Sequence, residues 1–299
     1  MDHVTRIHLK TSGKSRKDLI EFCLNGKSQY IAIGWSGAFE ISPEIRNYEE
    51  YYIAVKKRYN KKMDHAHNVF WSTEKDDLFW TRDLNGEYWI CRAIGKASPR
   101  YIPDIDIGAI IPVEAYKYGL EVPGQIKASF NRPCGGTCHD IYDSVIVEFS
   151  KKVYNQLSET ATYEIKPLKG NVLDNLPDFE LEELVISYIQ LKEGYYLLSN
   201  SIANKSTTIK IECEFIHRNI SELKKAVVQV KGGKSRQIDA LEYKDYDDKG
   251  YVVYLFAPAV VNSDKLKNSI VISRKELLNF YYEYKPILPH SITKFEEII

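Results

Sequence analysis

Short apolar runs, each closed by a turn-forming residue, fill the first 120 residues and constrain the fold more than any other feature. Aromatic and β-branched runs of this length, bounded by Gly, Asn and Asp, are typical of β-strands. An Asn-Gly pair, Asn85-Gly86, stands between two of them and predicts a hairpin. One helix is predicted in NYEEYYIAVKKRYNKK, where Tyr51 and Val55 recur at helical spacing. Many strands with one helix favour a small barrel. The predicted strands are SQYIAIGWS, NVFWS, KDDLFWTRD, GEYWICRAIGK and DIGAIIPVEAY.

A different pattern begins near Asp140. Residues 140–157 predict a helix, and the polar residues 158–177 predict a linker between domains 1–157 and 178–299. The second domain opens with the amphipathic segment PDFELEELVISYIQL and continues with strands, a crossover, two more strands and a helix. This order predicts an α/β sandwich. The expected fold class is therefore α+β, with a β-rich barrel followed by that sandwich.

Composition narrows the classes of protein to which the chain can belong. The N-terminal sequence has no apolar segment of the signal-peptide kind, and no apolar run is long enough to span a bilayer. The five cysteines form no evident disulfide framework. We therefore expect a cytoplasmic protein without a membrane segment. The 41 basic and 41 acidic residues balance, so only a local basic face could bind nucleic acid.

The segment AVVQVKGGKS contains the strongest candidate for chemistry. Gln229 and Lys231 are two residues apart, so both point to the same face of the predicted strand. On the preceding strand, Glu212 and Glu214 share a face. Carboxylate and amide oxygens can hold Mg²⁺ or Mn²⁺, which polarises a phosphodiester and lowers the pKa of a bound water. An ammonium group beside them can offset charge that develops on the phosphate.

With these residues the second domain resembles the PD-(D/E)xK nuclease superfamily, in the Gln-x-Lys variant of Mrr-like restriction endonucleases. The resemblance covers residues 178–285. It implies a restriction-endonuclease-like sandwich in which Glu182, Glu212, Gln229 and Lys231 are catalytic. Glu212 and Gln229 are then the metal ligands.

The resemblance has two departures. Glu212 stands where Asp is usual, with Glu214 as a rival, and Gln229 replaces a carboxylate, which implies lower metal affinity. Glu183 could replace Glu182 in its role. The double glycine after Lys231, Gly232 and Gly233, removes side chains where a nucleic-acid backbone would approach.

The first domain resembles PUA-like domains of the EVE, YTH and ASCH kind, in which a pseudo-barrel holds an extruded base. The segments that carry this resemblance are residues 30–36, 69–72, 75–95 and 122–133. It implies a pocket with flat walls for stacking and polar groups for the base edge. The expected walls are Trp35, Trp71 and Trp80, and Ser36 and Asp77 are the expected contacts to the edge of a modified base.

Basic residues in both domains are candidates for DNA contacts, because Lys and Arg neutralise phosphates. Several stand together at the end of the predicted helix, where the helix dipole also favours a solvated basic face. The candidates are Lys56, Lys57, Arg58, Arg82, Lys234 and Arg236.

Structural explanations compete with each functional one. Glutamate and lysine alternate on many half-solvated strands, and tryptophans in a β-rich domain belong more often to the core than to a ligand pocket. A glutamate in the first turn of a helix is favoured by the dipole alone. The segment CGGTCH, with Cys134, Cys138 and His139, could begin a zinc site, but no second cysteine pair follows.

These features predict a DNA endonuclease that recognises a modified, flipped base and cuts nearby with Mg²⁺ or Mn²⁺, in defence against phage DNA. The expected partner is double-stranded, base-modified DNA. Two cuts on opposite strands need two nuclease domains, so we expect a homodimer on DNA. One alternative is a non-catalytic nucleic-acid-binding protein, in which Glu212 lies too far from Gln229 to share a cation. The other is an RNA-directed nuclease.

Overall fold

The computed structural model describes residues 2–11, 15–59, 65–132, 135–202, 211–233 and 236–298. The chain forms two compact units, Met1–Lys166 and Pro167–Glu297. Their boundary lies within residues 158–177, where the sequence predicts a linker, although that stretch also contains a short helix, α7 (Val172–Asn175). The secondary structure is 42% helix and 25% strand, so the predicted mixed α+β class is confirmed.

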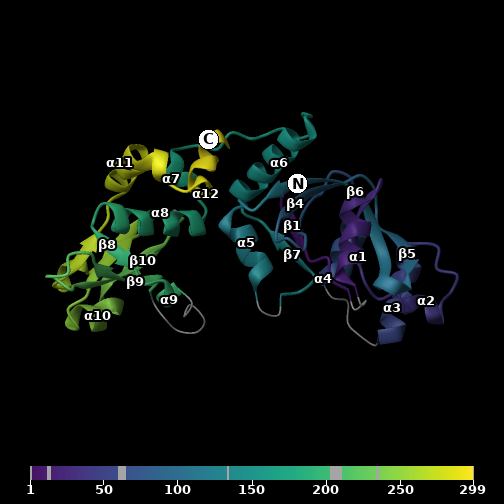
Figure 1. The fold of residues 1–299 in the computed structure, drawn as a ribbon, viewed down its shortest axis with the longest axis horizontal. Coiled ribbons are helices and arrows are strands. Elements are labelled where there is room, and N and C mark those ends of the chain that lie inside the picture. The colour runs from purple at the N-terminus through teal and green to yellow at the C-terminus, as the bar shows by residue number, and fades with distance from the viewer. Residues whose placement is uncertain are drawn as a thin grey trace. The chain divides into compact units, whose positions relative to one another are not determined.

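The first unit is built on a curled, half-barrel sheet of seven strands (Figure 1). The strand order is β2-β6-β4-β3-β1-β7, and β5 pairs with β6. Strands β1 and β3 run parallel, and the other pairs found in this sheet run antiparallel. The strands are β1 (Val4–Ile7), β2 (Gln29–Ile33), β3 (Leu78–Arg82), β4 (Tyr88–Ala93), β5 (Ser98–Ile102), β6 (Ile107–Gly119) and β7 (Cys138–Ile141).

Helices cover this sheet. Helix α3 packs against β5 and β6, and α6 packs against β1, β4 and β6. The core between them consists of apolar side chains from β2, β6, α3 and α4. The helices are α1 (Arg16–Ile20), the π-helix η1 (Glu21–Asn25), α2 (Ala38–Ile41), α3 (Tyr48–Tyr59), α4 (His65–Ser72), the short η2 (Pro103–Ile105), α5 (Gly124–Asn131) and α6 (Ser144–Ser158).

The structure confirms the predicted hairpin and corrects two element assignments. Strands β3 and β4 pair with Thr81 opposite Trp89, and Gly86 has a φ of 81° in the turn. The segment NVFWS, predicted as a strand, is the end of α4, because Ala66, Val69 and Phe70 bury one helical face. The helix predicted from residue 140 begins only at α6, where the Asp143 side chain caps it.

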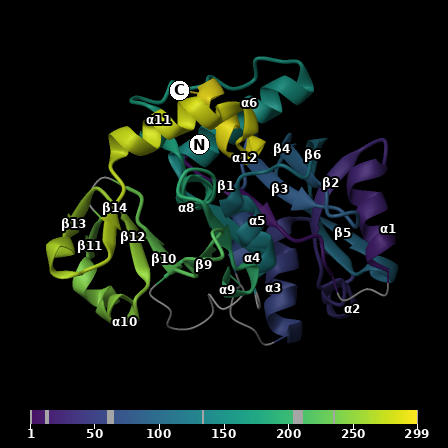
Figure 2. The ribbon, with the colours of Figure 1, turned by 60° about the vertical axis from the view of Figure 1, so that its left-hand side comes forward.

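The second unit contains a mixed five-stranded sheet of order β14-β12-β10-β9-β8 (Figure 2). Strands β10, β12 and β14 run parallel, and β8, β9 and β10 run antiparallel. A separate pair joins β11 and β13. The strands are β8 (Tyr195–Leu197), β9 (Cys213–His217), β10 (Lys225–Val230), β11 (Gln237–Asp239), β12 (Val252–Phe256), β13 (Ala259–Val261) and β14 (Ser269–Val271).

Helices lie on both faces of this sheet. Helix α8 packs against β8 and β10, and α10 packs against β12 from the opposite face (Figure 1). Ser273 caps α11 at the position that the sequence predicts for the start of the last long helix. The helices are α8 (Asp178–Leu191), α9 (Ser199–Ile202), η3 (Ala240–Tyr243), α10 (Lys244–Asp248), η4 (Ser263–Lys265), α11 (Arg274–Tyr284), η5 (Lys285–Ile287), α12 (His290–Thr293) and η6 (Lys294–Ile298). Within the ranges described, no helix combines the length and the apolar character needed to cross a membrane.

Candidate functional site

Glu212 and Gln229 meet on the second sheet. Strands β9 and β10 pair antiparallel with Cys213 opposite Val228, and the Glu212 N–H donates to the Val228 carbonyl at 2.8 Å. This register places Glu212 directly across from Gln229. The Gln229 Nε2 donates to Glu212 Oε1 at 2.8 Å, and both side chains are half-buried. The two residues that the sequence pairs as metal ligands are therefore in contact.

Lys231 extends the same row of polar side chains. Its backbone N–H donates to the Phe256 carbonyl at 2.8 Å, so the pairing with β12 continues past the end of β10. Its side chain therefore points to the same face as Gln229. Its Nζ donates to the Gln237 carbonyl at 3.1 Å. A carboxylate, an amide and an ammonium group thus share one face of the sheet, the face covered by η3 and α10.

The residues present fit a hydrated cation better than a closed metal site. Among the residues with described positions, no group of three or more His, Cys, Asp or Glu side chains could hold a metal ion. Glu212 offers one carboxylate, and Gln229 offers an amide oxygen once its amide rotates, because its nitrogen now faces Glu212. Mg²⁺ binds proteins through one or two such ligands and keeps several waters. The pair therefore fits a weakly held Mg²⁺ ion.

Glu182 comes from a helix rather than from these strands, and its catalytic role stays a prediction. It lies half-buried on α8, and α8 covers the other face of the sheet. The alternative, Glu183, accepts a hydrogen bond from Ser291 Oγ at 3.0 Å. The acid of α8 that contacts the double glycine is Asp178, which no sequence pattern singles out. Its carboxylate contacts Gly232 and pairs with Arg236 at 2.9 Å.

Gly232 makes room for α8 rather than for a ligand. A Cβ at this position would lie 2.6 Å from Asp178 Oδ1 and 3.1 Å from Leu181 Cδ2. The predicted role of Gly232 in admitting a nucleic-acid backbone is therefore replaced by helix packing.

A Gly232→Ala substitution should lower the free energy of unfolding of the second unit by about 1–3 kcal/mol, because the added methyl overpacks this contact. Urea denaturation measures the change. Adding Asp178→Ala should recover part of the loss, because it removes the closer of the two contacts. A Gly232→Ala variant as stable as the wild type would contradict the proposed packing.

Trp35 and Ser36 lie at a cavity of about 450 Å³ in the first unit, where Trp35 and Asp106, the partner of Ser36, form part of the wall. Trp35 follows β2 with a φ of 66°, a left-handed conformation that costs a non-glycine residue about 1–2 kcal/mol. Its indole ring lies 4.4 Å from the His67 ring. The Ser36 N–H and Oγ both donate to Asp106 Oδ1, at 2.9 and 2.7 Å. Tyr59 forms another wall, and burial together with the Asp106 carboxylate raises its pKa.

The other two tryptophans lie elsewhere, which corrects the predicted pocket. Trp80 is fully buried, and its Nε1 donates to Ser150 Oγ at 2.9 Å, so it cannot stack on a base. Its neighbours on β3 and α6 make it a core residue. Trp71 is 52% exposed on α4, with its ring about 6 Å from those of Tyr48 and Tyr52. It does not line the Trp35 cavity.

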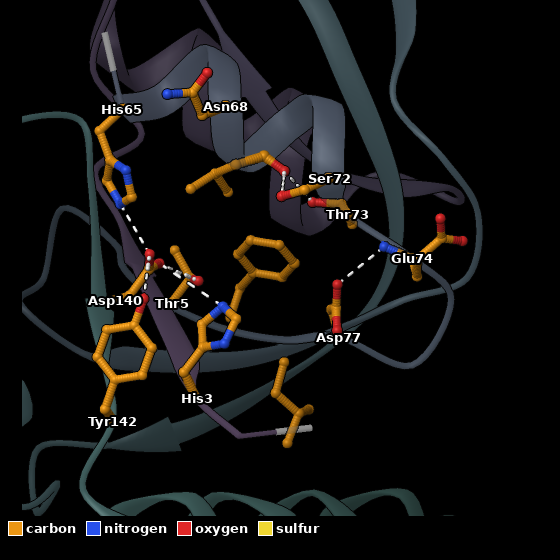
Figure 3. A pocket seen from close by; sticks show the side chains of 13 residues that line it. His3, Thr5, His65, Asn68, Ser72, Thr73, Glu74, Asp77, Asp140 and Tyr142 are labelled. Atoms are coloured by element: carbon orange, nitrogen blue, oxygen red, sulfur yellow. Dashed lines mark hydrogen bonds and ion pairs between the residues drawn. The ribbon is translucent and has the colours of Figure 1, made fainter.

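Asp77 lines a second cavity of about 380 Å³ (Figure 3). Its Oδ2 accepts a hydrogen bond from the Glu74 N–H at 2.9 Å, which shapes the turn before β3. Across the cavity, Asp140 accepts from Thr5 Oγ1 at 2.8 Å and lies 3.0 Å from His65 Nε2. Asp77 lines this second cavity, whereas Ser36 hydrogen-bonds to Asp106 of the Trp35 cavity, so the two predicted contacts do not face the same base edge.

The predicted DNA contacts have mixed surroundings. Lys56 and Lys57 are exposed on the last turn of α3, whereas Arg58 pairs with Glu40 at 2.9 Å. Arg236 is held by Asp178. Lys234, and Cys134 of the zinc hypothesis, lie outside the described residues.

Arg82 has a different environment. It is half-buried, and its guanidinium carbon lies 5.4 Å from the centre of the Phe130 ring.

No family model, no curated protein and no solved structure matches this chain. The residues and their geometry are therefore the basis for the function proposed below.

Proposed function

We propose that this protein is a metal-dependent DNA endonuclease that recognises a modified, flipped base through its first unit. The observation that carries the proposal is the contact between Glu212 and Gln229 at 2.8 Å, with Lys231 on the same face of the sheet. The alternative in which Glu212 and Gln229 lie too far apart to share a cation is incompatible with this distance.

The second unit supplies the groups for phosphodiester hydrolysis. Glu212 would hold Mg²⁺ or Mn²⁺ together with Gln229, once the Gln229 amide has rotated. The cation would polarise the phosphate and lower the pKa of a bound water. The Lys231 ammonium group offsets negative charge on the phosphate oxygens as it develops. The carbonyl of Gln237 holds Nζ in place, which limits the reorganisation needed during the reaction.

The arrangement of elements supports a PD-(D/E)xK-like interpretation of this unit. A helix, three antiparallel strands, a helical crossover and a parallel strand follow one another as α8, β8, β9, β10, α10 and β12. Gln229 lies on β10, Glu212 immediately precedes β9 and Lys231 immediately follows β10, which supports this interpretation. The curled half-barrel of the first unit is compatible with a PUA-like fold.

The Trp35 cavity is the best candidate for base recognition. Trp35 and Tyr59 supply aromatic surface for stacking, and Asp106 supplies a carboxylate for the edge of a base. Asp106 Oδ1 already accepts two hydrogen bonds from Ser36, which fixes the orientation of the carboxylate. The strained backbone at Trp35 is of the kind that collects at functional sites.

A Trp35→Ala substitution should reduce the preference for modified over unmodified DNA by about 10- to 100-fold, because base–aromatic stacking contributes about 1–3 kcal/mol. Competition binding between the two DNAs measures this preference. Trp71→Ala is the matched control, since Trp71 lies outside the cavity. Equal effects of the two substitutions would exclude the Trp35 cavity as the base pocket.

The test of the whole function is cleavage of phage DNA with and without base modification, in the presence of Mg²⁺ or Mn²⁺. Cutting of modified DNA alone supports both units' roles. Cutting without discrimination supports the nuclease and removes the base pocket. Binding of modified DNA without cutting favours a non-catalytic binding protein, and cleavage of RNA alone favours the RNA-directed alternative. A homodimer on DNA and a role in phage defence belong to the same proposal.

A further inference from the structure

Arg6 and Arg82 lie at the ring of Phe130 on the first unit, and each is close enough to a further arginine for their charges to interact. We call the four residues the arginine cluster: Arg6, Arg16, Arg82 and Arg132. Arg6 and Arg82 place their guanidinium carbons 5.7 and 5.4 Å from the centre of that ring. The Arg6 Nη2 lies 3.5 Å from the Cβ position of Gly135, which also lies 3.3 Å from the Arg132 carbonyl. Arg16 at the start of α1 donates from Nε to the Leu9 carbonyl at 3.2 Å.

Neutral acceptors hold the arginine cluster in place. Arg6 is buried, and its Nη1 donates to the carbonyls of Gly136 and Thr137 at 2.6 and 3.0 Å. Arg82 donates to Asn131 Oδ1 at 3.1 Å. Over the ranges that the structure describes, no arginine of the cluster forms an ion pair with Asp or Glu, and the buried Arg6 Nε has no hydrogen-bond partner.

The acid next to Arg82 in the chain has other partners. Asp83 accepts hydrogen bonds at its carboxylate from the N–H groups of Asn85 and Glu87 and from Trp89 Nε1. Its charge acts on Arg16 only at a distance, without an ion pair. Among the residues described, the positive charges of the cluster therefore have no acid in direct contact.

Burial and the charges of three arginines of the cluster act on His8 in the same direction. Burial, followed by the charges of Arg6, Arg82, Arg16 and Lys10, lowers the pKa of His8 to about 4. Burial and Arg82 also lower the pKa of Arg16, against a smaller opposing effect of Asp83. Like charges this close repel one another, so an anion bound among them would relieve the repulsion.

The cluster adjoins the Trp35 cavity through two shared segments. Strand β1 carries Arg6 and ends at Ile7, and the chain then reaches Lys10, which lines that cavity together with Thr137. The His8 N–H donates to the Thr137 carbonyl at 2.8 Å, and Arg6 donates to the same carbonyl. A strand that placed a base in the cavity would therefore carry its flanking phosphates past the cluster.

We propose that the arginine cluster binds the backbone phosphates of DNA that flank the base held in the Trp35 cavity. Guanidinium groups match phosphate geometry and stay charged at any physiological pH. The inference rests on the proposed function in one respect, namely that the ligand of the first unit is DNA. The exposed or half-exposed arginines at positions 16, 82 and 132 make the contacts, and buried Arg6 contributes through its field and by holding the segment 136–137.

The test is the salt dependence of binding of a short DNA duplex to the full chain, measured by fluorescence anisotropy. Arg16→Gln, Arg82→Gln and Arg132→Gln should each lower affinity about tenfold and reduce the slope of log affinity against log salt by about 1. Arg46→Gln is the matched control, because Arg46 is exposed on the same unit and pairs with Glu44 at 3.5 Å. It removes the same charge and should leave both quantities unchanged.

Three results would overturn the proposal. The first is an affinity for the duplex that is the same in the wild-type chain and in the three variants. The second is an equal loss from Arg46→Gln. The third is thermal stabilisation by inorganic phosphate that depends on the cluster while DNA affinity does not. Cleavage, assayed separately, distinguishes the two proposals. If the variants have a smaller salt slope but the wild type does not cleave DNA, the cluster is supported and the nuclease is refuted. If the wild type cleaves DNA and the variants keep the wild-type slope, the nuclease is supported and the cluster is refuted.

Discussion

Replacing Lys231 by alanine should lower the rate of Mg²⁺-dependent DNA cleavage by about 100- to 1,000-fold, the usual effect of removing one group that stabilises charge in a transition state. Lys231 lies two residues after Gln229, on the face of the sheet that also carries Glu212. Duplex affinity should change little, because we propose that the arginine cluster of the first unit makes most of the phosphate contacts. Single-turnover cleavage at saturating protein measures the rate without a contribution from binding.

Lys225→Ala is the control for this substitution. Lys225 opens the same strand, β10, is exposed, and lies with its Nζ 5.7 Å from the centre of the Tyr251 ring. This variant should cleave at close to the wild-type rate. If Lys231→Ala cleaves as fast as Lys225→Ala, the lysine of the Gln-Val-Lys segment is scaffold and the proposed chemistry is wrong.

Trp80→Ala should lower the free energy of unfolding by about 3–5 kcal/mol, whereas Trp71→Ala should lower it by less than about 1 kcal/mol. Trp80 is 0% exposed, so its removal leaves a large cavity and also removes the hydrogen bond that Ser150 Oγ accepts from the indole. Trp71 is 52% exposed and leaves no comparable void. Urea denaturation followed by circular dichroism gives both values.

The difference in stability between the Trp80→Ala and Trp71→Ala variants tests whether Trp80 is a core residue or a contact to the base. A stable Trp80→Ala variant with impaired binding of modified DNA would restore Trp80 as a base contact and contradict its assignment to the core. Equal destabilisation by both substitutions would contradict the position of Trp71 on the surface of α4.

The contact between Glu212 and Gln229 could be predicted because its determinants are local. Side chains alternate between the two faces of a strand, which places Gln229 and Lys231 on one face. The apolar pattern of the antiparallel neighbouring strand fixes its register, which places Glu212 on that face too. Helix α8 was evident from its apolar stripe, but which of its acids approaches the glycines was not. That depends on how the helix crosses the sheet, and the structure selects Asp178 over Glu182.

The first unit was harder to predict for a physical reason. NVFWS is apolar enough for a strand or a helix, and a run that short leaves the periodicity ambiguous. Tyr59 and Asp106 are far apart in the sequence and meet only in the folded cavity. The arginine cluster likewise draws on β1, α1, β3 and the end of α5. No spacing in the sequence marks either group.

The hydrogen bond between Gln229 and Glu212 also determines how the proposed nuclease behaves before it meets a cation. The Gln229 amide N–H already donates to the Glu212 carboxylate oxygen that a cation would bind. Without a cation, the two side chains therefore satisfy each other's hydrogen-bonding groups. Cation binding is then an exchange, in which one hydrogen bond is broken and the amide turns over. Such a site would bind its cation more weakly than two free ligands would, because the cation must displace this hydrogen bond.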